Sequence, residues 1–235
     1  MNTKTFEMEV SDLSVDVVKK DIKNIHLSVY PPTGRVRLSS PRSVKDESLR
    51  LYLISKLGWI RKHIRELNSQ VREPKREYIQ RESHYVQGQR YLMNVIEEES
   101  PPRVEVRNKK YLDLYIRPGS DRDKREQVMK EWYRGLLKKQ IPGLVEKWEK
   151  RLNLKVHDWG VRQMKTKWSS CNVDDARIWV NLELAKKPLH CLEYAILHEI
   201  LHLKERTHND RFVALLDNYM PAWKKIREEL NEVVY

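Results

Sequence analysis

Apolar and polar residues alternate on both sides of a short turn near the N-terminus. The segment KNIHLSVYPPTGRVRLSSP, residues 23–41, has this alternation on either side of Pro31 to Gly34. Proline and glycine favour turns, so the pattern predicts a β-hairpin. From Lys45 to Val71, apolar residues recur with a helical period, which predicts a helix with one apolar stripe. The stripe comprises Leu49, Ile54, Leu57, Ile60, Ile64 and Leu67.

Short strands and one long helix are predicted in the rest of the chain. The strands are expected within residues 89–97, 102–108, 111–117, 156–164 and 176–184. Residues 121–154 are strongly helical in composition, although Pro142 and Gly143 should kink or interrupt the helix. We therefore expect an α+β protein, with an N-terminal α+β region over residues 1–120 and a second domain over residues 121–235.

A further helix is predicted to follow Pro188, which suits the first turn of a helix. Its residues are apolar on nearly all sides, so the helix should be buried. These apolar residues are Leu189, Leu192, Ile196, Leu197, Ile200, Leu201 and Leu203. The same helix carries His198, Glu199 and His202. Such polar groups are costly to bury unpaired, whereas one bound divalent ion would satisfy them together.

Length and cysteine content agree with a globular protein that needs no cross-links. The 235 residues suffice for one large domain or two small ones, and we find no internal repeat of sequence. Cys171 and Cys191 form no CxxC pair, which favours a reducing compartment. Acidic residues near the N-terminus argue against a signal peptide, and no stretch has the ~20 apolar residues of a membrane span. We therefore expect a cytoplasmic protein without membrane contact.

The chain is basic, with 46 lysine and arginine residues against 34 acidic residues and a formal charge of +12. Such a charge attracts nucleic acid or another polyanion through long-range fields. The two signs are mixed along stretches such as KLGWIRKHIRELNSQVREPKREYIQRE, however, as they are on a solvated helix face. Solubility is therefore the preferred role of the charge, with nucleic acid as a partner that the charge also allows.

His198, Glu199 and His202 form the motif HExxH. Residues four apart lie on one face of a helix, one turn apart, so the two imidazoles can bind one ion. Glu199 points about 100° round the helix, towards water held beside the metal rather than towards the metal itself. In zinc hydrolases with this motif the glutamate polarises or deprotonates a metal-bound water, whose pKa zinc lowers to about 7.

A catalytic zinc needs a third protein ligand and one open position. His208 lies six residues after His202, so it could reach the ion only where the helix stops and the chain turns back. The segment RTHND, residues 206–210, favours such a turn. Glu205 shares a helix face with the first two histidines but lies about 10 Å along the axis from His198. We therefore prefer His208 to Glu205 as the third ligand.

Residues 163–212, QMKTKWSSCNVDDARIWVNLELAKKPLHCLEYAILHEILHLKERTHNDRF, resemble the YgjP-like metallopeptidase-domain family. The similarity includes a Trp-Gly-Ser-Cys segment, in which Ser169 replaces the glycine, then a strand with Leu-Asn and the HExxH helix. Upstream helices are similar too. The resemblance implies that residues 121–235 form a zincin-like domain with the motif on a buried helix. We assign no catalytic role to Trp168, Ser170 or Cys171, because packing accounts for such residues.

The resemblance also implies the composition of the site. His198, His202 and His208 would be the metal ligands, and Glu199 would be the general base. Three imidazoles suit zinc, so we expect one Zn²⁺ per chain.

The leading functional hypothesis is zinc-dependent hydrolysis of a protein or peptide substrate. Activated water would attack the carbonyl, and Glu199 would later pass the proton to the leaving amine. The predicted strand RIWVNL, residues 177–182, could align an extended substrate by β-addition. One alternative is metal-dependent hydrolysis of a nucleotide phosphoanhydride, although the sequence has no GxxxxGK[ST] loop. Another is a DNA-associated metalloprotein that acts on bound proteins.

Overall fold

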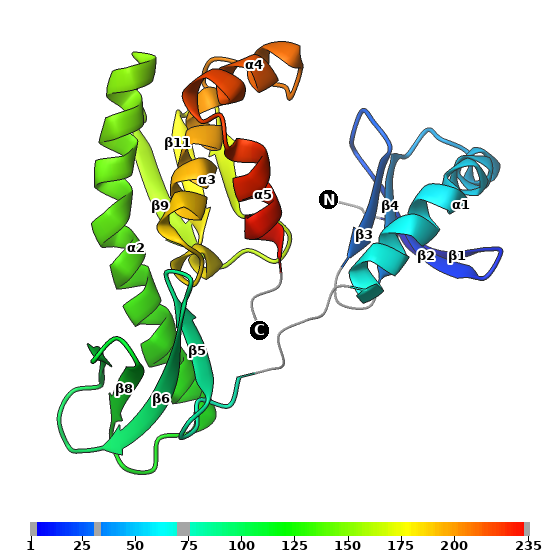
Figure 1. The fold of residues 1–235 in the computed structure, drawn as a ribbon. Helices are drawn as coiled ribbons and strands as arrows, with labels where there is room; N and C mark the ends of the chain where they lie inside the picture. The colour runs from blue at the N-terminus through cyan, green and yellow to red at the C-terminus, as the bar shows by residue number, and fades with distance from the viewer. Residues whose placement is uncertain (1–3, 31–33, 70–75, 233–235) are drawn as a thin grey trace. The chain divides into compact units, whose positions relative to one another are not determined.

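The computed structural model describes residues 4–30, 34–69 and 76–232, and the chain divides into two compact units (Figure 1). The first unit comprises residues 1–72 and the second comprises residues 73–235. The described residues form helices and three small sheets, which confirms the α+β fold class.

The first unit is a four-stranded sheet that packs against one helix. Its strands run in the order β1-β2-β4-β3; β2 and β4 are parallel and the other pairs are antiparallel. The elements are β1 (Lys4–Val10), β2 (Leu13–Lys20), β3 (His26–Tyr30), β4 (Arg35–Pro41) and α1 (Asp46–Ser69). Strands β2 and β4 bury Val15, Val17, Val36 and Leu38, which share a core with Leu49, Leu53 and Ile60 of α1.

The predicted hairpin is confirmed, because β3 and β4 pair antiparallel with Tyr30 opposite Arg35. Residues 31–33 of its predicted turn lie outside the described residues. Strands β1 and β2 were not predicted. Their apolar residues do alternate with polar ones, as in FEMEV and LSVDVV, and this signal would have found them.

The predicted helix is confirmed over Asp46–Ser69, and the last two residues of the prediction lie outside the described part of the chain. The buried stripe of this helix differs from the predicted stripe at one position. Leu53 is fully buried, whereas Ile54 is 47% exposed. Leu53 lies one turn after the buried Leu49, and Ile54 is displaced by about 100° from that face. The side chain of Leu67 lies outside the described residues.

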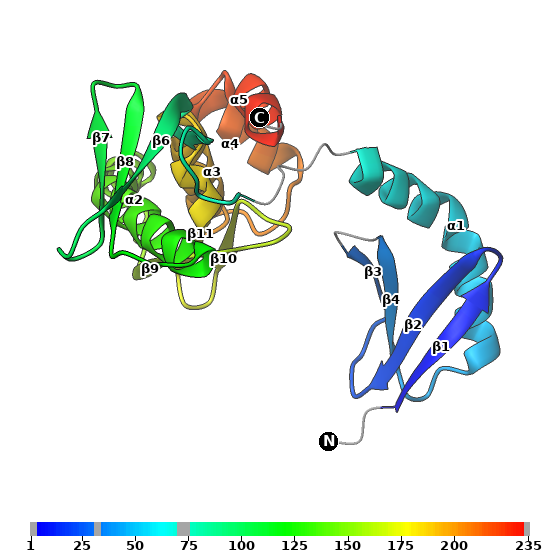
Figure 2. The ribbon, with the colours of Figure 1, turned by 90° about the horizontal axis from the view of Figure 1, so that it is seen from below.

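The second unit contains two sheets, and the long helix α2 contacts both (Figures 1 and 2). One sheet has the strand order β5-β6-β8-β7 and the other has the order β10-β11-β9. The strands are β5 (Ser83–Val86), β6 (Gln89–Glu97), β7 (Arg103–Arg107), β8 (Tyr111–Ile116), β9 (Asp158–Arg162), β10 (Ser169–Asn172) and β11 (Arg177–Asn181). The helices are α2 (Arg122–Leu152), the 3₁₀ helix η1 (Leu182–Ala185), α3 (Leu189–Leu201), α4 (Asp210–Tyr219) and α5 (Trp223–Asn231).

Helix α2 continues through Pro142, so the predicted interruption does not occur. Asp121 caps its start by accepting a hydrogen bond from the Lys124 backbone N–H, and Asn153 ends it in the left-handed region. One face is buried along the whole length, through Met129, Tyr133, Leu137, Ile141, Val145, Trp148 and Leu152. This packing on both sides of the proline outweighs the hydrogen bond that proline removes. No helix in the described residues is long and apolar enough to cross a membrane.

The chain divides into its two units at residue 72, whereas a boundary at residue 120 was predicted from the sequence. The β5–β6 turn explains the difference. The backbone N–H of Gln87 donates to the carbonyl of Ala185 at 3.0 Å, and that of Gly88 donates to Lys186 at 2.8 Å. These bonds fix the first sheet of the second unit to the chain just before α3, so the sheet belongs with the motif helix.

The two four-stranded sheets share one topology. In each, the outer pairs are antiparallel, the central pair is parallel, and a helix follows the last strand in sequence. The sequence has no visible repeat, so the same ββββα arrangement is specified by different residues in the two units.

Candidate active site

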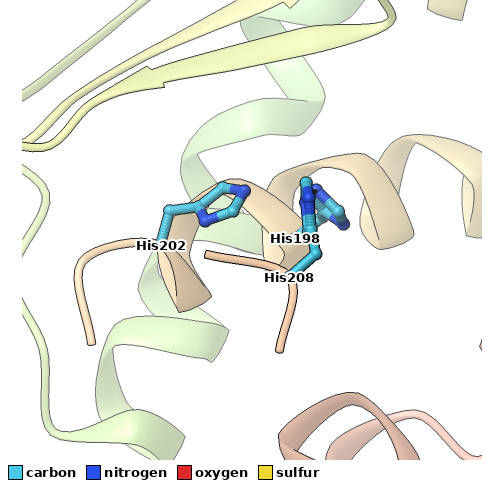
Figure 3. A group of neighbouring side chains, drawn as sticks. All are labelled: His198, His202 and His208. Carbon is cyan, nitrogen blue, oxygen red and sulfur yellow. Dashed lines mark hydrogen bonds between the residues drawn. The ribbon is translucent and has the colours of Figure 1, made fainter. Parts of the chain in front are cut away.

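Three histidines meet at the end of α3 (Figure 3). His198 lies in the last turn of the helix, His202 is its C-terminal cap, and His208 lies in the segment before α4. One ring nitrogen of each lies within 4.8 Å of the others, and the Nε2 atoms of His198 and His208 are 2.9 Å apart. Two nitrogens bound to one tetrahedral zinc lie about 3.3 Å apart, so small adjustments would accommodate an ion.

The chain reverses direction between His202 and His208, as the sequence predicted. The backbone N–H groups of Leu203, Lys204 and Glu205 bond to Ile200 and Leu201 and close the last turn of α3. Asn209 then caps α4, because its side chain accepts a hydrogen bond from the Phe212 backbone N–H at 3.0 Å. The side chain of Glu205 is not in the histidine group.

The ring of Phe212 packs against all three imidazoles. It is 1% exposed, and its ring centroid lies 4.9 Å from that of His198 and 4.8 Å from those of His202 and His208. The cap that starts α4 thus also places an aromatic ring against the cluster. Packing against this ring limits the orientations of the histidines before any ion binds.

The surroundings of His198 and His202 favour the neutral imidazole, which is the form that binds metals. Burial, and the neighbouring His202 and His208, lower the pKa of His198 to about 3. Burial also lowers the pKa of His202. The Nδ1 atom of His202 lies 3.1 Å from the Glu205 carbonyl, to which its N–H can donate, so that Nε2 is left as the ligand. The donor set therefore fits a borderline-soft divalent cation such as zinc.

Glu199 is buried beside these histidines, with 5% of its surface exposed. Its Oε1 atom accepts a hydrogen bond from the Ser169 hydroxyl at 2.7 Å. Burial raises the pKa of Glu199 to about 7, although the Ser169 hydroxyl, the charge of Lys167 and the Cys171 backbone N–H act in the opposite direction. A carboxyl group with such a pKa can both accept and donate a proton near neutral pH.

A buried asparagine holds the loop that supplies Ser169. The Asn181 amide donates to the carbonyls of Met164 and Lys167, at 3.1 and 2.7 Å, and accepts from the Met164 backbone N–H at 3.2 Å. The backbone N–H of Asn181 also donates to the Trp168 carbonyl at 2.9 Å. The end of β11 therefore determines where residues 164–169 lie against α3.

A cleft of about 250 Å³ opens beside His198 and Glu199. Trp168 lines it and also packs against the core, and its indole Nε1 donates to Asn231 Oδ1 at 3.0 Å. Cys171 is partly buried against the core, as the packing interpretation expected. The other lining residues that bear on function are Lys167, Ser169, Tyr194 and Arg227.

Comparison with known proteins identifies the family of the chain. Residues 23–233 match the YgjP-like metallopeptidase domain, which is nearly the whole chain. The chain belongs to the YgjP-like family. One similar solved structure is the crystal structure of the metallopeptidase zymogen of Pyrococcus abyssi abylysin. The two sequences are 19% identical, and the match covers 38% of this chain and 90% of that chain, with a TM-score of 0.36. No curated protein matches the chain at a significant level.

In this YgjP-like protein, the strand that was predicted to pair with an extended substrate has no free edge. Strand β11 was expected to receive an extended substrate, but β10 and β9 already pair with its two sides. The prediction was wrong because both edges of β11 are hydrogen-bonded. Strand β10 is terminal in this sheet and contacts α3, and its first residue, Ser169, lines the cleft.

Several residues of the YgjP-like site were not predicted from the sequence. Tyr194 lies four positions before His198, and its ring meets that of His198 edge-on at 5.8 Å. The helical spacing used for the histidines could have found it. No local signal could have found the Ser169 and Arg227 placements, because they depend on a strand and a helix packed against α3.

A second group in this YgjP-like chain, His190, Cys191 and Glu229, also brings three candidate ligand atoms within 4.8 Å. The His190 Nε2 atom already lies 2.5 Å from a Glu229 oxygen. Burial is the main cause that raises the pKa of the Cys191 thiol to about 11, so little of it is the thiolate that binds metals. This group is a weaker metal site than the three histidines.

Proposed function

We propose that this YgjP-like metallopeptidase is a zinc-dependent peptidase, with His198, His202 and His208 as ligands and Glu199 as general base. The carrying observation is that three imidazoles lie together at the end of α3, and that one of them, His198, lines a cleft with the buried carboxyl group of Glu199. Zinc held by three imidazoles acts as a Lewis acid and makes water a nucleophile near neutral pH.

Glu199 would move the proton in both halves of the reaction. It would accept the proton from the attacking water and then donate it to the nitrogen of the leaving amine, so the carboxylate is regenerated. Its raised pKa suits both transfers. The hydroxyl of Ser169 orients the carboxyl group, because its hydrogen bond to Oε1 limits rotation of the side chain.

The outer edge of β10 is our candidate for substrate alignment. This strand is terminal in its sheet and begins at Ser169, which lines the cleft. An extended peptide that pairs with this edge would pass beside Glu199. Main-chain hydrogen bonds would then supply affinity without demanding a particular side chain.

The decisive experiment compares wild type with Glu199→Gln from matched preparations. The amide keeps the shape of the carboxylate but cannot accept the proton, so zinc content should be unchanged while hydrolysis falls by about hundredfold or more. Turnover is measured on unstructured proteins, peptides and nucleotides, with and without DNA. Cleavage of nucleotides but not of proteins would replace the peptidase by the alternative hydrolase. Equal activity of the two proteins would remove Glu199 as the base.

A further inference from the structure

Two cations line the cleft beside Glu199 without an ion-pair partner among the described residues. Lys167 precedes β10, and Arg227 lies on α5. Both side chains are exposed, and the only acidic residue that lines the same cleft is Glu199, which is buried. Two positive charges thus lie beside the reacting centre, and no surface carboxylate is among the described residues that line this cleft.

Some basic residues of the second unit do pair with protein carboxylates. Lys224 lies 3.9 Å from Asp217, Lys186 forms an ion pair with Glu183, and Arg206 forms one with Asp174 at 2.9 Å. Lys225 also has no ion-pair partner among the described residues, but it does not line the cleft. Lys167 and Arg227 line the same cleft as His198 and Glu199.

Two aromatic residues, Trp168 and Tyr194, also line the cleft. Trp168 is fixed by its hydrogen bond to Asn231, and Tyr194 is 5% exposed and stacked on Trp223. Rigid aromatic walls with cations at the rim suit a ligand that has a short apolar part and an anionic end. In an unmodified peptide, the only such end is a carboxylate.

We propose that this cleft is a carboxylate-binding subsite, in which Lys167 and Arg227 select peptides that present a carboxylate next to the scissile bond. The inference rests on the proposed peptidase function and specifies its substrate class. The carboxylate can belong to the C-terminus or to an aspartate or glutamate side chain. Lys167 and Arg227 are specificity-determining residues, and neither transfers a proton.

The test measures binding to the zinc-loaded Glu199→Gln protein, which separates recognition from turnover and from the effect of Lys167 on the base. The probes are four pools of degenerate, fluorescently labelled octapeptides. Two differ only in a free or amidated C-terminus, and two amidated pools differ only in a central glutamate or glutamine. Fluorescence anisotropy gives the dissociation constants. Zinc-free wild type is a second background, in case the glutamine variant does not fold.

One carboxylate pool or both should bind about threefold to tenfold more tightly than the matched neutral pool, and the pool that does so identifies the source of the carboxylate. Lys167→Met and Arg227→Met should each remove most of this preference. Lys225→Met is the matched control, because Lys225 is an exposed residue of the same helix as Arg227 but does not line the cleft. It should leave the preference unchanged.

Two outcomes would overturn the subsite. Either all four pools bind alike, or Lys225→Met lowers the preference as much as the cleft variants do, which would indicate attraction by the overall charge of +12. The protein could show a carboxylate preference that depends on Lys167 and Arg227 and yet hydrolyse no peptide. That result would support the subsite and contradict the peptidase function. Hydrolysis without any preference would reject the subsite alone.

Discussion

The hydroxyl of Ser169 donates a 2.7 Å hydrogen bond to Oε1 of Glu199, across 30 positions of sequence. The bond joins the first residue of β10 to the buried face of α3. A carboxyl group that must accept a proton from one direction gains from such a fixed orientation.

Ser169→Ala should lower the turnover number about tenfold or more, because a hydrogen bond to a charged group is worth roughly 1.5–3 kcal/mol. Zinc content should not change, since Ser169 is not in the histidine group. Steady-state kinetics and elemental analysis on the same samples measure both quantities. Ser170→Ala is the control, because that hydroxyl contacts Arg162 rather than Glu199. An equal loss in both variants would indicate damage to β10 instead.

The histidine cluster should hold one zinc per chain. His198→Ala, His202→Ala and His208→Ala should each abolish stoichiometric binding, because a catalytic site requires three protein ligands. Elemental analysis after purification without chelators, followed by zinc titration, checks this. Full occupancy in any of the three variants would remove that residue from the ligand set.

Two matched variants test whether the ligands are confined to these histidines. Glu205→Ala should keep the zinc, because it is the backbone carbonyl of Glu205 that contacts His202. Cys191→Ser should also leave the stoichiometry at one, since burial raises the pKa of that thiol to about 11. Loss of zinc in Glu205→Ala would contradict the ligand assignment. So would a wild type that binds two ions together with a Cys191→Ser variant that binds one.

Gly88→Ala should destabilise the second unit by about 2–4 kcal/mol. Gly88 has a φ of +81°, and an added Cβ would lie 2.6 Å from Cγ of Pro188. The backbone conformation costs roughly 1–2 kcal/mol in a non-glycine residue, and the clash with a rigid ring adds to it. Urea unfolding measures the loss. Gly119→Ala isolates the backbone contribution, because Gly119 has a φ of +73° with no atom within 4 Å of the added Cβ.

Acid should destabilise the second unit through His84. This side chain is 3% exposed, and burial lowers its pKa to about 4 although Glu82 lies 3.0 Å away. Between the unfolded pKa of 6.5 and the folded pKa of about 4, only the unfolded chain binds the proton. The stability present above pH 6.5 is therefore lost as the pH falls to 4, by up to about 3 kcal/mol.

Urea unfolding at several pH values measures this loss, and tryptophan fluorescence reports it because six of the seven tryptophans lie beyond residue 73. His84→Gln should flatten the dependence between pH 6.5 and pH 4. His157→Gln should not, because His157 is exposed. Parallel curves for wild type and His84→Gln would show that other groups cause the acid sensitivity.

Local periodicity predicted most of the elements, because each depends on residues close in sequence. The strands within residues 89–117 and the helix that carries HExxH follow directly from such patterns. Strand β10 was missed, since SSCN alternates no apolar residues and pairs only because β11 lies beside it. Helix α2 passes through Pro142 for a similar reason, as its buried face is set by packing rather than by propensity.

The sequence by itself determined that His198 and His202 share a helix face and that the chain can turn at Asn209, because both depend on bonds within a few residues. Only the tertiary structure decided that Ser169, Lys167 and Arg227 line one cleft with Glu199. Ser169 begins strand β10, Lys167 lies in the loop before it, and Arg227 lies on helix α5. The positions of these elements against α3 depend on long-range pairing and core packing, which no local pattern encodes.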